Sequence, residues 1–317
     1  MYDPLGALDT TPAETVFWLH TVSVRVTSMT NSRVRARLVV SAFVCLVGSV
    51  GAIAIGLEAR QTKPAAKPKS TQTTKRPPAA AAAAAPKVER PVPFAAGETL
   101  SYDVSWSMAF VTAGSATLRV VDKHASYGSM AYYLLGEGRP SPMLAKLYSL
   151  YYKADSLLDV YSLTSQRGSV YSDENGRKRL KSLRFNPDGR TAIFEMQTST
   201  SMKKDIAVPA LAQDALSALY AMRAMPLAPG TTIKMPVCIS DAVYSLSAAV
   251  GQREDVKTGI GTLPGFKITP TVVDAAGKPI GRKMTLWLSD DAKRIPLRLQ
   301  ADLPVGSFNL VLREVKY

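Results

Sequence analysis

The chain has 317 residues, 46% of them hydrophobic, which is enough for one large or two small globular domains, and its formal net charge is +14. Residues 1–93 hold 12 Lys and Arg against 5 Asp and Glu, so the positive charge is densest there, in a low-complexity segment that favours an anionic envelope surface over a nucleic-acid groove. With Cys45 and Cys238 as its two cysteines, the chain is unlike a disulfide framework or a zinc site built on Cys pairs.

The N-terminal region has the features of an export signal. Residues 1–37 are interpreted as an extension ending in a basic segment, and Met29 is a candidate for the true start because three arginines follow it closely. Residues 38–57 are apolar over about 20 positions, the length that spans a bilayer, so we expect a transmembrane signal anchor, with a cleaved signal peptide as the alternative. Three arginines before this segment and Arg60 after it place the N-terminus in the cytoplasm. The folded domain is then expected in the periplasm, anchored to the inner membrane or secreted after cleavage.

Residues 58–93 are rich in proline, alanine and lysine and are predicted to be a disordered linker. Proline favours an extended backbone and the like charges repel, so the segment is expected to reach on the order of 100 Å at most. It is interpreted as a tether, with contact to anionic envelope polymers as a further hypothesis.

Residues 94–317 are predicted to form one β-rich domain. The first expected strand, Thr99 to Trp106, alternates between apolar and polar side chains, as a strand with one buried face does. Further alternating segments follow, separated by turn sequences such as Asn175-Gly176 and Asn186-Pro187-Asp188-Gly189. We therefore expect a mainly β fold, an antiparallel meander that forms a barrel, half-barrel or strongly curved sheet with one short helix.

That helix is expected between Asp214, which can cap its first turn, and Pro226, which ends it; a shorter helical turn is expected at 142–147. One face of the helix carries Leu216, Leu219, Tyr220 and Arg223. An arginine buried without a partner costs several kcal/mol. Arg223 is therefore expected to pair with an aspartate (Asp103, Asp155 or Asp159) or to bind an anionic ligand.

No catalytic residue and no metal site are predicted. His124 falls in an expected turn. The sequence has no Gly-x-Ser-x-Gly motif, so no nucleophilic serine is marked for which His124 could act as the base. The adjacent carboxylates Glu254-Asp255 would point to opposite faces of a strand, and Asp290-Asp291 is expected to form a turn.

A basic cluster in the expected hairpin is interpreted as a solvated strand edge that discourages aggregation; it consists of Arg177, Lys178, Arg179, Lys181 and Arg184. Only Phe185 lies near it for base stacking, so no nucleic-acid partner is expected. The glycine-rich residues 259–265 precede no expected helix, so we predict a flexible loop and no phosphate or other cofactor site.

Three blocks of sequence resemble one bacterial family. They are Phe94-x-x-Gly97-Glu98-x-Leu100-x-Tyr102-x-Val104-x-Trp106, the helix segment Asp214 to Tyr220 with Arg223 and Leu227-x-Pro229-Gly230, and Leu286-Trp287-Leu288-Ser289-Asp290-Asp291-x-x-Arg294-Ile295-Pro296. Together the blocks resemble the domain-of-unknown-function family 3108, and they are spread over about residues 94–317. The resemblance implies an exported, β-rich envelope protein and no catalytic residues.

We expect non-enzymatic binding of an apolar or amphiphilic ligand or of an envelope partner, because a curved sheet closed by a helix can enclose an apolar cavity. A hydrolase acting on envelope polymers and a purely structural envelope scaffold are the alternatives. Candidate ligand-binding residues are Arg223, Tyr220, Trp106 and Tyr102. The expected partners are the membrane, through the N-terminal anchor, and a lipid, a lipoprotein or an anionic envelope polymer.

Overall fold

The computed structural model describes residues 87–106, 111–146, 148–303 and 306–317. The predicted extension, the apolar segment 38–57 and most of the predicted linker lie outside the described residues. Within the described ranges, no helix is long and apolar enough to cross a membrane.

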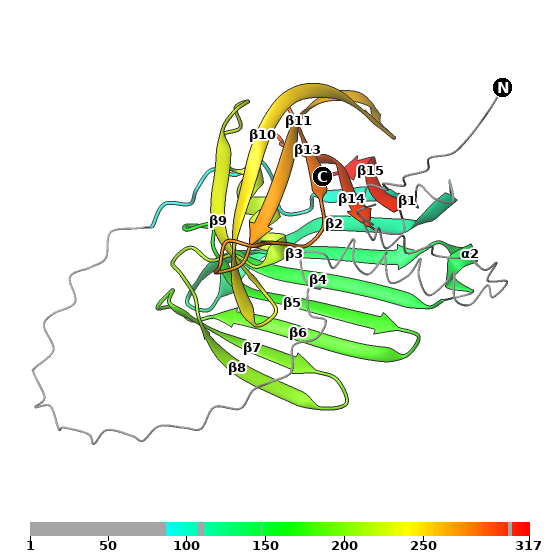
Figure 1. The fold of residues 1–317 in the computed structure, drawn as a ribbon. Helices are drawn as coiled ribbons and strands as arrows, with labels where there is room; N and C mark the ends of the chain where they lie inside the picture. The colour runs from blue at the N-terminus through cyan, green and yellow to red at the C-terminus, as the bar shows by residue number, and fades with distance from the viewer. Residues whose placement is uncertain (1–86, 107–110, 147, 304–305) are drawn as a thin grey trace, which may run out of the picture. The chain divides into compact units, whose positions relative to one another are not determined.

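One 15-stranded sheet contains every strand of the described chain, and its ladders are antiparallel (Figure 1). The elements in chain order are β1 (Thr99–Trp106), β2 (Val111–Ser126), β3 (Ser129–Pro140), α2 (Pro142–Ala145), β4 (Leu150–Asp159), β5 (Ser165–Glu174), β6 (Arg177–Phe185), β7 (Thr191–Gln197), β8 (Ser201–Ala207), α3 (Ala215–Arg223), β9 (Thr232–Ile239), β10 (Ala242–Thr258), β11 (Gly261–Val273), β12 (Pro279–Ile280), β13 (Met284–Ser289), β14 (Pro296–Leu303) and β15 (Gly306–Lys316).

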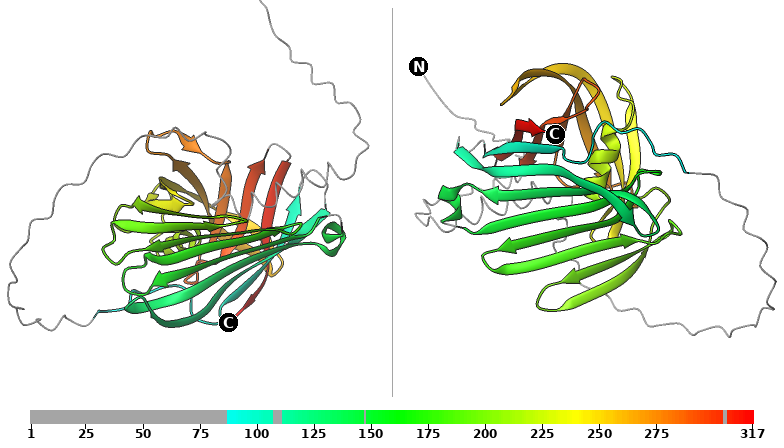
Figure 2. Two further views of the ribbon diagram at one scale, coloured as in Figure 1. Left: turned by 90° about the horizontal axis from the view of Figure 1, so that it is seen from below. Right: turned by 180° about the vertical axis from the view of Figure 1, so that it is seen from behind.

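The sheet consists of two meanders joined in its middle. Strands β1 to β8 follow one another outward on one side, and β1 pairs with β15 in the middle. On the other side the order is β15, β14, β13, β11, β10 and β9, and β12 pairs with β11 beside this path. The green strands of the first half run side by side, and the yellow and orange strands of the second half cross over them (Figures 1 and 2). The predicted antiparallel, strongly curved sheet is therefore confirmed.

The two ends of the sheet meet through side chains. Among the described residues, no ladder joins β8 to β9, so the sheet is open. Leu183 of β6, Phe194 of β7 and Ile206 of β8 instead pack into one buried cluster with Cys238 of β9. Apolar side-chain contacts thus keep the two ends of the curled sheet together, although no ladder of backbone hydrogen bonds joins β8 to β9 in the described chain.

Helix α3 links β8 to β9 and lies inside this curl. The carboxylate of Asp214 caps it, accepting hydrogen bonds from the amides of Leu216 (2.8 Å) and Ser217 (3.1 Å), as predicted. Most residues of α3 are buried, on more than one face, so it is a central helix and not a surface helix with one apolar stripe. The shorter α2 forms where a helical turn was expected.

The turn predictions are confirmed at the β5–β6 hairpin, where Asn175 and Gly176 have φ of 51° and 82°, as a type I′ turn requires. Two other predictions are wrong. His124 lies inside β2 and not in a turn, because β2 and β3 keep pairing as far as Ser126. The predicted flexible loop at 259–265 is mostly strand β11, because residues from Gly261 onward pair with β10.

Candidate functional site

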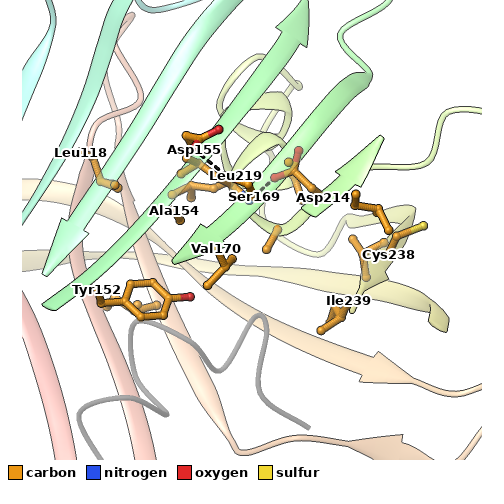
Figure 3. A pocket seen from close by; sticks show the side chains of 18 of the residues that line it. Leu118, Tyr152, Ala154, Asp155, Ser169, Val170, Asp214, Leu219, Cys238 and Ile239 are labelled. Carbon is orange, nitrogen blue, oxygen red and sulfur yellow. Dashed lines mark hydrogen bonds between the residues drawn. The ribbon is translucent and has the colours of Figure 1, made fainter. Parts of the chain in front are cut away.

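A cavity of about 250 Å³ lies between the two halves of the sheet and helix α3. Its lining is mostly apolar. Figure 3 shows Leu118 of β2, Tyr152 and Ala154 of β4 and Val170 of β5, with Ile239 of β9 among the lining residues. Lining residues from the second half of the sheet include Leu299 and Leu310.

One row of residues, paired from strand to strand, crosses the first half of the sheet and lines the cavity. The strand register pairs Leu118 with Gly136, Gly136 with Ala154, Ala154 with Val170, and Val170 with Lys181. All five residues line the cavity. A Cβ atom on Gly136 would lie 3.3 Å from a methyl carbon of Leu118, so the small residues in the row keep this space open.

The start of helix α3 brings a buried carboxylate to the cavity wall. Asp214 accepts hydrogen bonds from the hydroxyls of Ser156 and Ser165, both at 2.6 Å, in addition to its capping bonds. Burial raises the pKa of this carboxyl, while the hydroxyl and amide donors oppose that shift. A side chain at Gly168 would meet Asp214 at 2.6 Å, so glycine is needed there for the helix to approach β5.

The other acidic residues of the lining are also occupied by protein partners. Glu137 accepts hydrogen bonds from Tyr151 (2.6 Å) and Arg119 (3.3 Å). Asp155 is bound by Arg167 and by the hydroxyl of Ser169, as Figure 3 shows for the serine. These carboxylates therefore stabilise the wall.

The structure brings no nucleophile and base together among the residues singled out from the sequence. Burial raises the pKa of the Cys238 thiol to about 12, so the reactive thiolate is scarce at neutral pH. The imidazole of His124 is exposed and contacts Asp122 at 2.6 Å. Glu254 and Asp255 lie on adjacent positions of β10, and Glu254 accepts a hydrogen bond from the indole of Trp287.

Arg223 is paired inside the protein, but its partner is Glu98 and not one of the predicted aspartates. Two parallel hydrogen bonds of 2.7 and 2.9 Å join the guanidinium to the Glu98 carboxylate, and both side chains are 0% exposed. The guanidinium also donates to the backbone carbonyls of Lys293 and Arg294, each at 3.1 Å. Glu98 precedes β1, so this cluster ties the helix to β1 and to the β13–β14 turn.

Two of the other predicted ligand-binding residues lie near this ion pair. Tyr220 places its ring 5.0 Å from the Arg223 guanidinium and is fully buried. Tyr102 lines the cavity and donates to the carbonyl of Pro296 at 3.0 Å, and burial raises its pKa well above the usual value. Trp106 instead stacks on Phe308, with ring centroids 5.9 Å apart. Ligand binding by these four residues stays a prediction.

Lys181 is the cavity residue that the sequence interpretation misplaced. Its neighbours Arg177, Lys178, Arg179 and Arg184 are exposed as predicted, but Lys181 is half-buried and lines the cavity. Strand β6 is also internal, between β5 and β7, and not an edge. The alternation of side chains along β6 indicates the inward position of Lys181, because Lys181 lies on the same strand face as the buried Leu183.

An open antiparallel sheet curled around a buried helix and an apolar cavity defines a β-barrel-like protein. The chain belongs to the family described as "Protein of unknown function (DUF3108)", whose model matches residues 101–313. The resemblance drawn from the three sequence blocks is thereby confirmed. Comparison with curated proteins finds no match.

Several solved structures are similar to the chain at low identity. A β-barrel-like protein of domain of unknown function DUF1849 from Brucella abortus is 11% identical, with a TM-score of 0.46 over 72% of this chain and 98% of that one. A protein from Bacteroides fragilis, whose description proposes an exported protein with a YmcC-like fold, is 13% identical, with a TM-score of 0.30 over 73% and 100%. A protein from Parabacteroides distasonis, whose description proposes a lipoprotein, is 10% identical, with a TM-score of 0.32 over 72% and 100%.

Proposed function

We propose that this protein binds an apolar or amphiphilic molecule in the cavity under α3, without catalysing a reaction on it. The observation that carries the proposal is the mostly apolar lining of a cavity of about 250 Å³. Ligand pockets of proteins are typically about 300–1,000 Å³, mainly apolar, with a few polar groups that orient the ligand. This cavity lies just below that range, so it suits a single chain or a compact molecule.

The half-buried state of several lining residues supports a ligand. Leu118, Ala154, Val170 and Leu219 face the cavity, yet none of them is fully buried by the protein itself. Each Å² of apolar surface removed from water contributes about 25 cal/mol, so a ligand covering these side chains gains affinity from their burial. A purely structural scaffold would favour a filled interior at this position.

The partners of the lining carboxylates favour binding over hydrolysis. A hydrolase needs acidic or nucleophilic groups that are free to reach the substrate. Asp214 instead caps the helix and binds two serines, and Asp155 is held by Arg167 and Ser169. These groups fix the shape of the cavity.

Photolabelling of the full chain in membranes tests the proposal. The probe is a twelve-carbon alcohol with a diazirine near the end of its chain, and labelled peptides are identified by mass spectrometry. We expect labels on peptides that line the cavity and their loss in Ala154→Phe, whose ring would fill the space. Ala249→Phe is the matched control, because Ala249 is an exposed strand residue outside the lining. Labels spread over the exposed surface, or equal labelling of both variants, would contradict a binding cavity.

We also propose that the chain is held at the inner membrane by residues 38–57, with the β domain in the periplasm. The apolar length of this segment and the arginines before it support that orientation. A reporter that is active only in the periplasm, fused after Tyr317, should be active. A fusion active only in the cytoplasm would contradict this location.

A further inference from the structure

Lys181 introduces a positive charge into a mostly apolar wall. It lies opposite Val170 of β5 and Met196 of β7 in the strand register. Among the described residues it is the one Lys or Arg that lines the cavity. Its ammonium donates a hydrogen bond to the hydroxyl of Ser240, in the β9–β10 turn, at 3.1 Å. The charge therefore sits where the end of β9 meets the first half of the sheet.

The charge of Lys181 is only partly offset by a neighbouring carboxylate, that of Asp241. Within the described part of the chain, no acidic oxygen lies at ion-pair distance from it, and the nearby Asp241 is bound by Lys204 at 2.9 Å. Burial and the positive charge of Arg179 lower the pKa of Lys181 while the Asp241 carboxylate opposes that shift, so on balance the surroundings disfavour the bare cation. An ammonium has three donors, and Ser240 takes one of them.

The three acidic residues of the lining each have protein partners, and none of them forms an ion pair with Lys181 in the described part of the chain. Asp155 binds Arg167, and Glu137 accepts from Arg119 and Tyr151. Asp214 is held by two serine hydroxyls and the first amides of α3. Arginines pair with Asp155 and Glu137, and burial raises the pKa of Asp214 toward its neutral form, so the repulsion of an incoming anion is reduced. Lys181 offers that anion a cation with unused donors.

From Lys181 the apolar row leads away across the sheet through Val170, Ala154 and Gly136 to Leu118. Neighbouring strands lie about 4.8 Å apart, so the row covers about 19 Å from Lys181 to Leu118. A charged group at one end and an apolar track of this length match a molecule with an anionic head and one hydrocarbon chain.

We propose, on the basis of the binding function proposed above, that the cavity takes an anionic single-chain amphiphile of the fatty-acid type. Lys181 binds its carboxylate, and the chain lies along the row toward Leu118. The cavity volume of about 250 Å³ favours one chain over two. Charge-assisted hydrogen bonds are about twice as strong as neutral ones, so the head group adds specificity to the apolar contacts.

Two diazirine probes of the same chain length, one a carboxylate and one an alcohol, test this assignment on the full chain in membranes. Lys181→Met removes the charge and keeps most of the stem, Lys181→Arg keeps the charge, and Lys178→Met removes an exposed charge from the same strand. We expect Lys181→Met to lose about tenfold in cavity labelling by the carboxylate and to change less than twofold with the alcohol. Lys181→Arg and Lys178→Met should stay within about threefold of the unchanged protein with both probes.

The outcomes separate the two proposals. Labelling of the cavity by both probes with no loss in Lys181→Met would overturn the role of Lys181 and leave apolar binding intact. Absence of cavity labelling by either probe would overturn both proposals. Excess acetate carries the same carboxylate without a chain, and we expect it not to compete; competition by acetate would show a simple anion site and overturn the amphiphile. Thermal unfolding of each variant checks that the fold is unchanged, and Lys181→Gln replaces Lys181→Met if that variant does not fold.

Discussion

Replacing Arg223 by methionine should destabilise the domain strongly. The change keeps much of the side-chain volume and removes the charge, so the Glu98 carboxylate is left buried without its partner. Both side chains are 0% exposed and joined by two hydrogen bonds of 2.7 and 2.9 Å. Removing one partner of such a pair costs about 3–5 kcal/mol. The carbonyls of Lys293 and Arg294 also lose a donor, which favours the upper part of that range.

Urea unfolding followed by circular dichroism measures this loss. Arg313→Met is the matched control, because Arg313 pairs with Asp103 at 3.3 Å while both side chains are about half exposed, and such pairs contribute about 1 kcal/mol or less. The double variant Glu98→Leu with Arg223→Met should recover most of the loss, since no charge is then left unpaired. A loss below about 1 kcal/mol in Arg223→Met, or a double variant as unstable as the single one, would refute the reasoning.

Three further predictions concern the turn, the helix cap and the N-terminal boundary. Gly176→Ala should lower the free energy of unfolding by about 1 kcal/mol, because φ is 82° there and the added Cβ contacts nothing within 4 Å; an unchanged urea midpoint would contradict this. The pKa of Asp214 is raised in the folded state, so protonation of its carboxyl favours the fold. The free energy of unfolding of the wild type, relative to that of Asp214→Asn, should be greatest below the pKa of the unfolded state and decline as the pH rises to the pKa of the folded state. Unfolding measured from pH 3 to 7 should show this decline, and a difference between the two proteins that does not change with pH would contradict it. A chain that starts at Lys87 should unfold cooperatively and be more stable than one that starts at Val92, because the Arg90 amide donates to the carbonyl of Val160 at 3.0 Å; equal stability by urea unfolding would show that this contact contributes nothing.

Local features of the fold were predictable from the sequence because they depend on near neighbours. The Asn175-Gly176 turn follows from the ease with which both residues adopt positive φ. The cap at Asp214 follows from the spacing of a short acidic side chain and the first free amides of a helix. Alternation likewise indicated which face of β1 is buried.

Long-range features were not predictable in the same way. Glu98 and Arg223 are brought together by the path of the chain across the sheet, and no local pattern distinguishes Glu98 from another acidic residue as the partner. Sequence proximity places Lys181 in a run of basic residues, but it does not show which strands curl back to meet β6. The cavity itself depends on that curl, which the buried cluster around Cys238 maintains without strand pairing.

The pairing of β1 with β15 also has a consequence for how the chain acquires its structure. Thr99 faces Lys316, so the central ladder of the sheet joins the first and the last strand of the domain. Folding slows as contacts connect residues farther apart in the chain, since the entropy of loop closure is lost before the contact forms. Each half can pair locally as it emerges, but the two halves can join only when the C-terminal strand is present. A chain in which β15 has not yet been synthesised therefore lacks the strand that joins the two halves, and its sheet is completed later than that of a meander of the same size with adjacent partners.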